Sequence, residues 1–333
     1  MVKLAAMGVA VSLACTGCLS LTTASPQAKK LVPGRAAPVR PLRPVPTPAR
    51  PLVGVYEPAA PSGWSQIAEF ARATAIQPKV VAYYSSWNSP FDTSFAQSAW
   101  AHHAYALVQL QPNDVTLTSI ANGASDAYLR SYARAVVAFG HPVILSFGHE
   151  MNGDWYSWGN GHASPAAFVA AWRHIVRLFR AAGASNATWL WTVNSIAGAS
   201  NALRQWWPGS AWVDWTGIDG YFYGAADTFG TVLGPTIADI RSFSDAPLLI
   251  AETAVGTTKD RDSQIDGLLA GVRDAHLAGL IWFDVAQHDG LYHQDWRLED
   301  DADALAAFTK AVATYLSKPH RGHRSLAPKA TAS

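Results

Sequence analysis

The chain has 333 residues, of which 49% are hydrophobic and 14 are tryptophan, and its formal net charge is +1. This composition excludes a disordered chain and provides enough apolar side chains for a large folded core. The charge is unevenly distributed. Residues 51–317 hold 14 of the 25 basic residues and all 24 acidic ones, which argues against nucleic acid as a partner.

The first 25 residues have the pattern of an export signal, with a charged start and an apolar run that ends near Cys18. The run is too short to span a bilayer, so we expect a secreted protein with no transmembrane span. Lipid attachment at Cys18, which would anchor the protein at the cell envelope, is the alternative. Both cysteines, Cys15 and Cys18, lie in this segment, so we expect no disulfide and no thiol chemistry in the rest of the chain.

Two basic segments flank the part of the chain that has apolar patterning. Residues 26–50 are rich in proline and predict a semi-extended linker. Residues 318–333 predict a disordered tail. A single folded domain is therefore expected over residues 51–317, and we expect it to be a monomer.

Apolar runs typical of buried strands alternate with helical patterns from residue 51 onward. The predicted strands are 52–55, 80–84, 104–110, 142–147, 188–193, 215–218, 247–251 and 280–283. The predicted helices are 64–74, 94–100, 125–139, 232–242, 263–276 and 301–316, with one more that begins at Ser164-Pro165 and ends at Gly183.

Eight strand-then-helix units in this length predict an α/β protein, a single (β/α)₈ TIM barrel. A doubly wound sheet is the structural alternative. That fold normally has a glycine-rich phosphate loop after its first strand, and the sequence Val55-Tyr56-Glu57-Pro58 stands there instead.

Two glutamates stand at strand ends, where a barrel enzyme carries its active residues. Glu150 follows the fourth predicted strand, and Glu252 follows four apolar residues of the seventh. A carboxylate is costly to bury without a partner, so we expect both to face the barrel mouth. Glycoside hydrolysis needs two such groups, one protonated acid and one ionised nucleophile.

The other residues at the predicted strand ends are aromatics and amides, which suit a neutral sugar because aromatic rings stack on pyranose rings and amides bind hydroxyls. The residues concerned are Tyr84, Trp87, Gln111, Asn194, Tyr221 and Trp282, and the segment after Glu150 adds Trp155, Tyr156 and Trp158. We expect Asn194 and Trp158 among the substrate-binding residues. Gln111 and Asn194 have a competing interpretation as hydrogen-bond linkers of the barrel mouth.

The segment His149-Glu-Met-Asn-Gly-Asp-Trp-Tyr156 resembles the acid/base signature of glycoside hydrolase family 26, and 247–252 resembles its nucleophile strand. The family is one of retaining (β/α)₈ glycosidases. The resemblance implies that Glu150 is the acid/base and Glu252 the nucleophile, and that His149 holds the site together beside them, among the substrate-binding residues.

The same resemblance implies that Tyr221 hydrogen-bonds the nucleophile, that Trp155 packs against the sugar, and that Trp282 forms an aromatic platform. It also implies a polysaccharide substrate, above all β-1,4-mannan, with mixed-linkage β-1,3-1,4-glucan and β-1,3-xylan as alternatives. We therefore expect a retaining endo-β-glycanase, most simply a mannan endo-1,4-β-mannosidase, that needs no cofactor.

Other site chemistries fit the sequence less well. His149-Glu150 is not the start of a zinc helix, because Gly153 stands where the second histidine would be and the run before it predicts a strand. A metal site at His288-Asp289, His293 and Asp295 is less favoured than an exposed polar loop. No Gly-x-Ser-x-Gly elbow supports a serine esterase. A non-catalytic glycan-binding barrel stays open, although two paired carboxylates argue against it.

Overall fold

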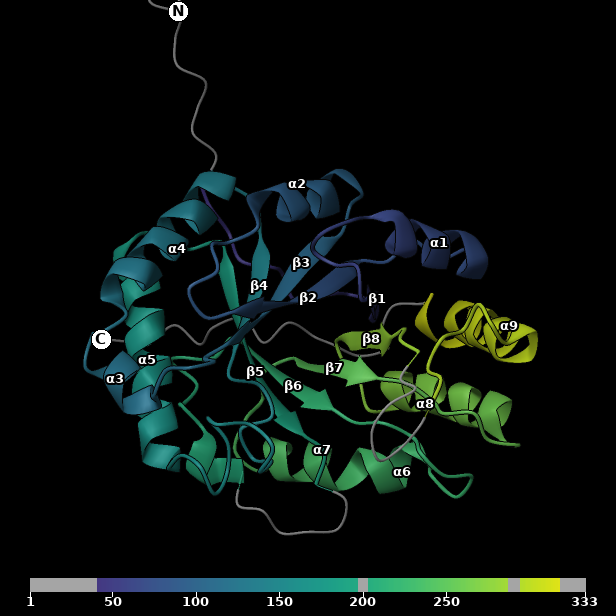
Figure 1. Cartoon of the computed structure of the whole chain (residues 1–333). Coiled ribbons are helices and arrows are strands. Elements are labelled where there is room, and N and C mark those ends of the chain that lie inside the picture. Colours follow the sequence, from purple (N-terminus) through teal and green to yellow (C-terminus); the bar gives the residue numbers. More distant parts are fainter. Residues whose placement is uncertain (1–40, 197–202, 287–293, 318–333) are drawn as a thin grey trace, which may run out of the picture. The chain divides into compact units, whose positions relative to one another are not determined.

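The computed structural model describes residues 41–196, 203–286 and 294–317. Within these ranges, eight parallel strands form one closed barrel in chain order, each paired with its sequence neighbours and β1 with β8. Helices surround the barrel (Figure 1). The predicted (β/α)₈ fold class is confirmed.

The strands are short and buried, as a barrel wall requires. They are β1 Leu52–Tyr56, β2 Val80–Ser86, β3 Tyr105–Gln111, β4 Val143–Phe147, β5 Ala187–Asn194, β6 Trp215–Asp219, β7 Leu248–Thr253 and β8 Gly279–Phe283. Every predicted strand is found, with ends that differ by one or two residues.

The helices follow the strands and cover the outside of the barrel (Figure 1). They are α1 Ser65–Thr74, α2 Thr93–Ala101, α3 Leu117–Ala121, α4 Asp126–Phe139, α5 Pro165–Ala181, η1 Leu203–Trp206, α6 Phe229–Val232, α7 Gly234–Arg241, α8 Arg261–Asp274, α9 Ala302–Ala311 and η2 Val312–Leu316. The short helices α3, η1 and α6 were not predicted, apart from Val232 at the end of α6, and the helix predicted over 232–242 corresponds to α7.

The start of α5 shows how local sequence positions a helix after the loop that carries Glu150. The side chain of Ser164 accepts a hydrogen bond from the amide of Ala167, which satisfies one of the free donors of the first turn. Pro165 occupies the first helical position, where it has no amide to satisfy. Phe168, Trp172 and Ile175 then face the barrel and are buried.

The side chains of each strand alternate between the barrel interior and the surrounding helices. In β3, Leu107 belongs to the interior cluster, whereas Val108 packs among the residues beneath the helices. In β4, Ile144 and Leu145 divide in the same way. This alternation decides which strand residues can reach a ligand at the mouth.

The folded unit begins before residue 51. Val45 is buried within the interior cluster, and its amide donates a 2.8 Å hydrogen bond to the hydroxyl of Thr188. The predicted linker over residues 26–50 is therefore wrong for its last part, because the compact unit starts at Pro41. Because this stretch is rich in proline and basic residues, its composition did not indicate that the barrel buries Val45.

None of the helices in the described ranges combines the length and the apolar character that a membrane crossing demands.

Candidate active site

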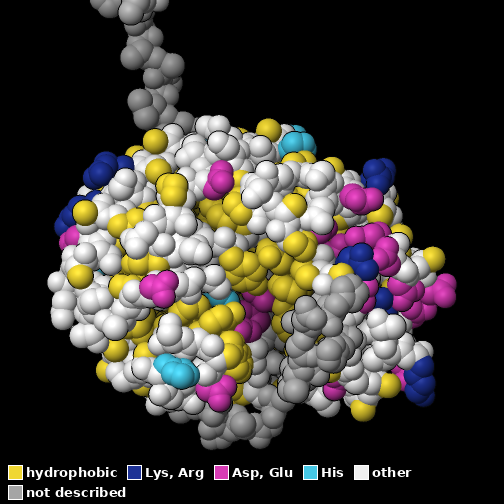
Figure 2. Space-filling view, viewed as in Figure 1, with side chains coloured by type: hydrophobic (Ala, Val, Ile, Leu, Met, Phe, Trp, Pro, Cys, Tyr) yellow, Lys and Arg dark blue, Asp and Glu magenta, His cyan; other side chains and the backbone are white. Residues whose placement is uncertain are grey.

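Polar side chains replace the apolar interior at the carboxyl ends of the strands. Figure 2 shows acidic side chains in the central depression of this face, bordered by hydrophobic ones. The residues concerned are Tyr84 on β2, Gln109 on β3, Asn194 and Asp219 at the ends of β5 and β6, and Glu252 on β7, with Glu150 just after β4. The two predicted carboxylates are thus part of one polar layer.

Glu150 is held by an unusual backbone. Gly148 has φ +54° and Glu150 has φ +53°, a region that residues other than glycine rarely occupy. A Cβ on Gly148 would lie 3.2 Å from the rings of Phe168 and Trp158. The amide of Glu150 donates to the carbonyl of Thr192 on β5. This left-handed turn lets the chain leave the strand and still keep the carboxyl group at the mouth.

Two donors bind the Glu150 carboxyl group, one on each oxygen. The Nδ2 of Asn194 donates to Oε1 at 2.7 Å, and the indole N–H of Trp155 donates to Oε2 at 2.8 Å. Asn194 is itself fixed by Asn152, whose side chain binds the backbone N–H and carbonyl of Asn194 at 2.9 and 2.8 Å. Asn194 is therefore a positioning group for Glu150, as the linker interpretation proposed.

Trp155 is the most exposed of the site aromatics, with 54% of its surface accessible. Its indole lies directly over Gly153, where a Cβ would come within 2.3 Å of the ring. The glycine that distinguishes this segment from a zinc helix thus allows the indole to reach Glu150. One edge of the ring binds the acid while the rest is open to a ligand.

His149 is buried, so its ring is not accessible to a sugar. Its Nε2 shares a 3.1 Å hydrogen bond with the hydroxyl of Tyr156, and among the described residues no group pairs with its Nδ1. Burial lowers the pKa of His149 to about 3, so the ring is neutral. His149 supports the loop, and its prediction as a substrate-binding residue is wrong because its ring is buried.

Glu252 lies inside β7 and is bound from β2, from β3 and from Tyr221, two residues after the end of β6. The hydroxyl of Tyr221 donates to Oε2 at 2.7 Å. The hydroxyl of Tyr84 and the Nε2 of Gln109, the latter at 3.4 Å, donate to Oε1. Register shifts on both sides of β7 accompany this position, and such irregularities re-aim side chains at barrel rims.

The tyrosines that bind Glu252 remain protonated. Burial, followed by the charge of Glu252, raises the pKa of both Tyr84 and Tyr221 well above the usual value. They therefore serve as fixed donors to a carboxylate. Tyr84 was singled out at a strand end, but its partnership with Glu252 was not predicted, and Gln109 was missed.

The two glutamates form a coupled pair. Burial raises the pKa of Glu150, and hydrogen bonds from Asn194 and Trp155 lower it again. Burial and then the charge of Glu150 raise the pKa of Glu252 to about 8. The pKa of both groups is therefore raised, which favours a proton on one of them. Glu252 accepts from three donors and Glu150 from two, so we expect Glu252 to be the group that ionises first.

Asp219 lies beneath the pair and is completely buried. Among the described residues, neither of its carboxyl oxygens has a hydrogen-bond partner. Burial, then the charges of Glu252 and Glu150, raise the pKa of Asp219 well above its usual range. Burial and the neighbouring carboxylates thus favour the protonated form of Asp219.

Two of the predicted sugar-binding residues are not at the mouth. Trp282 is completely buried, its N–H binds the carbonyl of Trp296, and its ring packs against Phe308 of α9. Ile281 belongs to the interior cluster, so alternation turns Trp282 outward and brings Phe283 to the mouth. The prediction of a Trp282 platform is wrong for this physical reason.

Trp158 is 2% exposed and also lies away from any ligand. Its N–H donates to the carbonyl of His149 at 2.9 Å, and its ring stacks on Tyr156. It closes the loop beneath Glu150, which corrects its prediction as a substrate-binding residue. Trp87 is likewise in the core, where its ring contacts Tyr128 and Phe147.

A wall of aromatic rings stands beside Glu252. Phe283 stacks on Tyr56 with ring centres 4.9 Å apart and meets the edge of Tyr221 at 5.5 Å. Tyr223 is 37% exposed at the outer end of this wall. Gln111 ends β3 and is partly exposed, with no contact to either glutamate among the described hydrogen bonds. The rings of this wall form, at the mouth, the aromatic surface that was predicted for Trp282.

No group of three His, Cys, Asp or Glu side chains suited to a metal occurs within the described residues. Residues 288, 289 and 293 of the weaker metal candidate lie outside the described ranges. What the described mouth does provide is two buried carboxyl groups, those of Glu150 and Glu252.

Known proteins resemble this chain in sequence, and others resemble it in fold. The model of glycosyl hydrolase family 26 matches residues 116–250. Endoglucanase H of Acetivibrio thermocellus is 29% identical over 286 residues, which are 80% of this chain and 31% of that protein. A mannan endo-1,4-beta-mannosidase of Bifidobacterium adolescentis is 29% identical over 133 residues, 38% of this chain and 13% of that protein. The chain thus spans less than a third of either relative.

A solved structure shares the fold at low sequence identity. An endo-beta-1,4-mannanase of Cellulomonas fimi, solved as a double mutant, superposes with a TM-score of 0.62 at 18% identity. The superposition covers 79% of this chain and 70% of the mannanase. This likeness is one of fold.

Proposed function

We propose that this chain, whose residues 116–250 match the model of glycosyl hydrolase family 26, is a retaining endo-β-glycanase of that family with Glu150 as acid/base and Glu252 as nucleophile. The single observation that carries the proposal is that two buried carboxyl groups at the barrel mouth are held by separate sets of donors. Such a pair keeps one acid protonated beside one ionised nucleophile.

In the first step, the ionised Oε of Glu252 attacks the anomeric carbon while Glu150 gives its proton to the glycosidic oxygen. The C–O bond to the leaving sugar breaks, and a covalent glycosyl-enzyme forms. Asn194 and Trp155 hold Glu150 for this transfer. In the second step, Glu150 takes a proton from water, the water oxygen attacks the anomeric carbon, and Glu252 leaves as a carboxylate.

The substrate that we propose is a β-1,4-mannan, which the family resemblance supports. The exposed Trp155 and the ring wall at Phe283 suit the C–H faces of a neutral polysaccharide. A β-glucan, including mixed-linkage glucan, is the second candidate. The observation in its favour is that the relative whose alignment covers 80% of this chain is named an endoglucanase.

Reducing-end release from glucomannan, mixed-linkage β-glucan and β-1,3-xylan, measured side by side, tests the proposal and ranks the substrates. NMR of the first product should show the β-anomer before mutarotation, as retention requires. A first product with the α-anomer would refute the double displacement. A purified protein that binds these glycans but releases no reducing ends would instead support the glycan-binding alternative.

We also propose that the protein is exported, either in secreted form or with lipid on Cys18. The support is the apolar segment at the start of the chain. Mass spectrometry of the mature N-terminus separates the two forms, because a lipid on Cys18 would add the mass of its acyl chains. An unprocessed N-terminus at Met1 would contradict export by cleavage.

A further inference from the structure

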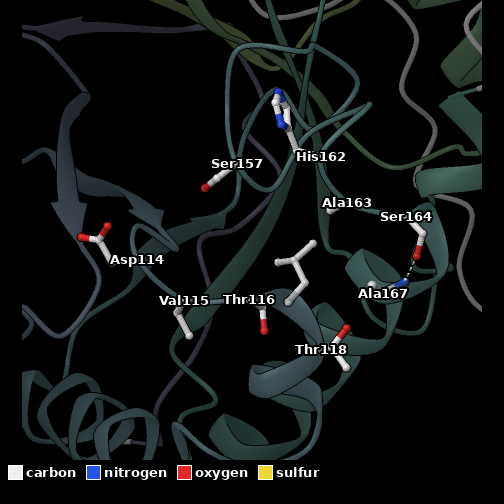
Figure 3. A pocket seen from close by; sticks show the side chains of 10 residues that line it. Asp114, Val115, Thr116, Thr118, Ser157, His162, Ala163, Ser164 and Ala167 are labelled. Atoms are coloured by element: carbon white, nitrogen blue, oxygen red, sulfur yellow. Dashed lines mark hydrogen bonds between the residues drawn. The ribbon is translucent and has the colours of Figure 1, made fainter.

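A second hollow opens between the loop after β3 and the loop after β4. It has a volume of about 520 Å³, which lies within the range of small-ligand sites. One wall runs from Asp114 to Thr118, and the other includes Ser157 and His162 to Ser164. Figure 3 shows these side chains around the open centre, with Asp114 on one side and Ser164 on the other.

Several polar side-chain groups around this hollow are not engaged in hydrogen bonds that stabilise the fold. Within the described residues, the carboxylate of Asp114 and the hydroxyls of Thr118 and Ser157 make no hydrogen bond, and all three residues are exposed. The Nε2 of His162 pairs with the carbonyl of Asp154 at 2.8 Å, so its N–H is at Nε2 and its Nδ1 is left as an acceptor. Donors and acceptors are therefore both available.

The floor of the hollow is apolar. It consists of Val115, Leu117, Ala163 and Ala167. An apolar floor with hydroxyl, imidazole and carboxylate groups at the rim matches the two kinds of surface on a sugar ring, C–H faces and hydroxyls. The lining has no Lys or Arg for an anion and only one carboxylate, too few for a cation.

The hollow lies on the acid/base side of the mouth. β3 and β7 are four strands apart in either direction around the closed barrel, so the hollow stands across the axis from Glu252. The loop that forms one wall also carries Trp155, two residues before Ser157, and the Trp155 indole binds Glu150. His162 ties the same wall to Asp154, next to Trp155.

The position of the hollow indicates which part of the polysaccharide lies near it. The nucleophile bonds to the sugar that stays on the enzyme, whereas the acid protonates the oxygen of the sugar that leaves. The leaving part of the chain therefore extends over the Glu150 side. The exposed face of Trp155 lies between Glu150 and the hollow along that loop.

We propose that the hollow of Asp114, Thr118, Ser157 and His162 is a distal subsite that binds a sugar of the leaving part of the polysaccharide. The proposal rests on the proposed function, because it needs a substrate that extends across the mouth. Binding there draws on contacts remote from the reacting bond, so it should favour long chains over short ones.

Thr118→Trp tests the subsite, because Thr118 is exposed and its hydroxyl supports no other residue. We would measure kcat/KM with β-1,4-manno-oligosaccharides and mixed-linkage gluco-oligosaccharides of three to seven sugars. Aryl β-glycosides, whose leaving group is not a sugar, complete the series. The variant should lose at least tenfold on the longest chains and less than twofold on trisaccharides and aryl glycosides. Asp114→Asn, which keeps a residue that tolerates φ +59°, should show the same length dependence to a smaller degree.

Thr314→Trp is the matched control. Thr314 is exposed and lines another hollow, of about 630 Å³, formed by α8, α9 and η2 outside the barrel. Thr314→Trp should leave kcat/KM unchanged for every substrate. An equal loss on all lengths in Thr118→Trp, or no loss on any, would overturn the subsite while the wild type stays active. A wild type inactive on every substrate would overturn the proposed function, and the subsite with it.

Discussion

The two catalytic candidates occupy different kinds of structure. Glu252 lies within a strand, and its three donors come from β2, β3 and the residue after Gly220, all part of the barrel end. Glu150 lies after its strand, in a left-handed turn, and one of its two donors is the half-exposed Trp155 of a surface loop. The proposed nucleophile is thus held by the scaffold, whereas the proposed acid/base is held partly by a loop.

This difference corresponds to the chemistry. A nucleophile keeps one protonation state and one position, which a rigid ring of donors provides. An acid/base gives up a proton and then recovers one, so its environment must tolerate both states. If this comparison is right, donors on Glu252 and donors on Glu150 should affect opposite limbs of the pH profile.

The largest effects are expected from the carboxyl groups themselves. Glu252→Gln should lower kcat by more than about 10⁴-fold on every substrate, because no covalent intermediate can form. Glu150→Gln should lower kcat/KM on polysaccharide by about 10²- to 10⁴-fold, the usual contribution of a general acid. Dinitrophenyl glycosides, which leave without a proton, should retain most of their first-step rate in Glu150→Gln.

Single-turnover kinetics with these glycosides would measure that first step directly. If Glu150→Gln lost the burst of dinitrophenol to the same degree as Glu252→Gln, the roles of the two residues would not be distinguishable and the comparison would fail.

Donors on Glu252 should have the next largest effect. Tyr221→Phe removes a hydrogen bond to a carboxylate, worth about 1.5–3 kcal/mol, so kcat/KM at neutral pH should fall about 10- to 100-fold. Since this bond lowers the pKa of Glu252, its loss should move the acidic limb to higher pH by about one to two units. Tyr84→Phe should act in the same direction.

The pH dependence of kcat/KM would check this result. The matched control is Tyr156→Phe, whose hydroxyl binds His149 and neither carboxylate. A shift of the alkaline limb in Tyr221→Phe, with the acidic limb unmoved, would place the proton on Glu252 instead.

Donors on Glu150 should have a smaller effect on the opposite limb. The hydrogen bonds from Asn194 and Trp155 lower the pKa of Glu150. Trp155→Phe keeps a ring but removes the donor, so the acid should hold its proton to higher pH. A neutral hydrogen bond is worth about 0.5–1.5 kcal/mol, which corresponds to a shift of about 0.5 to 1 unit in the alkaline limb. An unmoved alkaline limb would show that the indole N–H does not tune the acid.

Most of the fold followed from the sequence because each barrel strand combines an apolar run with a polar end. Glu150 and Glu252 were recognisable for the same reason, since a carboxylate after buried residues needs a special place. The hydrogen bond from Trp155 to Glu150 could not be predicted from the sequence. It depends on the close packing of the indole over Gly153, a tertiary contact with no local signal.

Strand alternation would have improved the site prediction. In β3, Leu107 and Gln109 share one face, so a polar residue in an apolar run pointed to the interior. The same rule turns Trp282 away from the mouth and brings Phe283 toward it. Val45 offered no comparable signal, because burial of one residue in a proline-rich stretch depends on where the chain passes under the barrel.

The smallest effect on activity is expected from two other buried carboxyl groups, and it tests whether burial alone makes a catalytic acid. Burial raises the pKa of Glu57 to about 8. Burial and the neighbouring Glu299 raise that of Asp284 to about 10. Within the described residues, neither Glu57 nor Asp284 hydrogen-bonds Glu150 or Glu252, so Asp284→Asn should change kcat by less than about twofold.

Stability should respond to Asp284→Asn instead. An acid whose pKa is higher in the folded state than in the unfolded state stabilises the fold below its unfolded pKa, and this stabilisation is lost as pH rises toward the folded value. The wild type should therefore lose free energy of unfolding between pH 5 and pH 9, by about 1.4 kcal/mol per pH unit for each proton that only the folded state retains. Asp284→Asn should have a shallower slope in urea unfolding at these pH values. A slope equal to that of the wild type, with kcat reduced more than tenfold, would mean that Asp284 belongs to the reaction and that the catalytic pair is not the only carboxyl system at this end of the barrel.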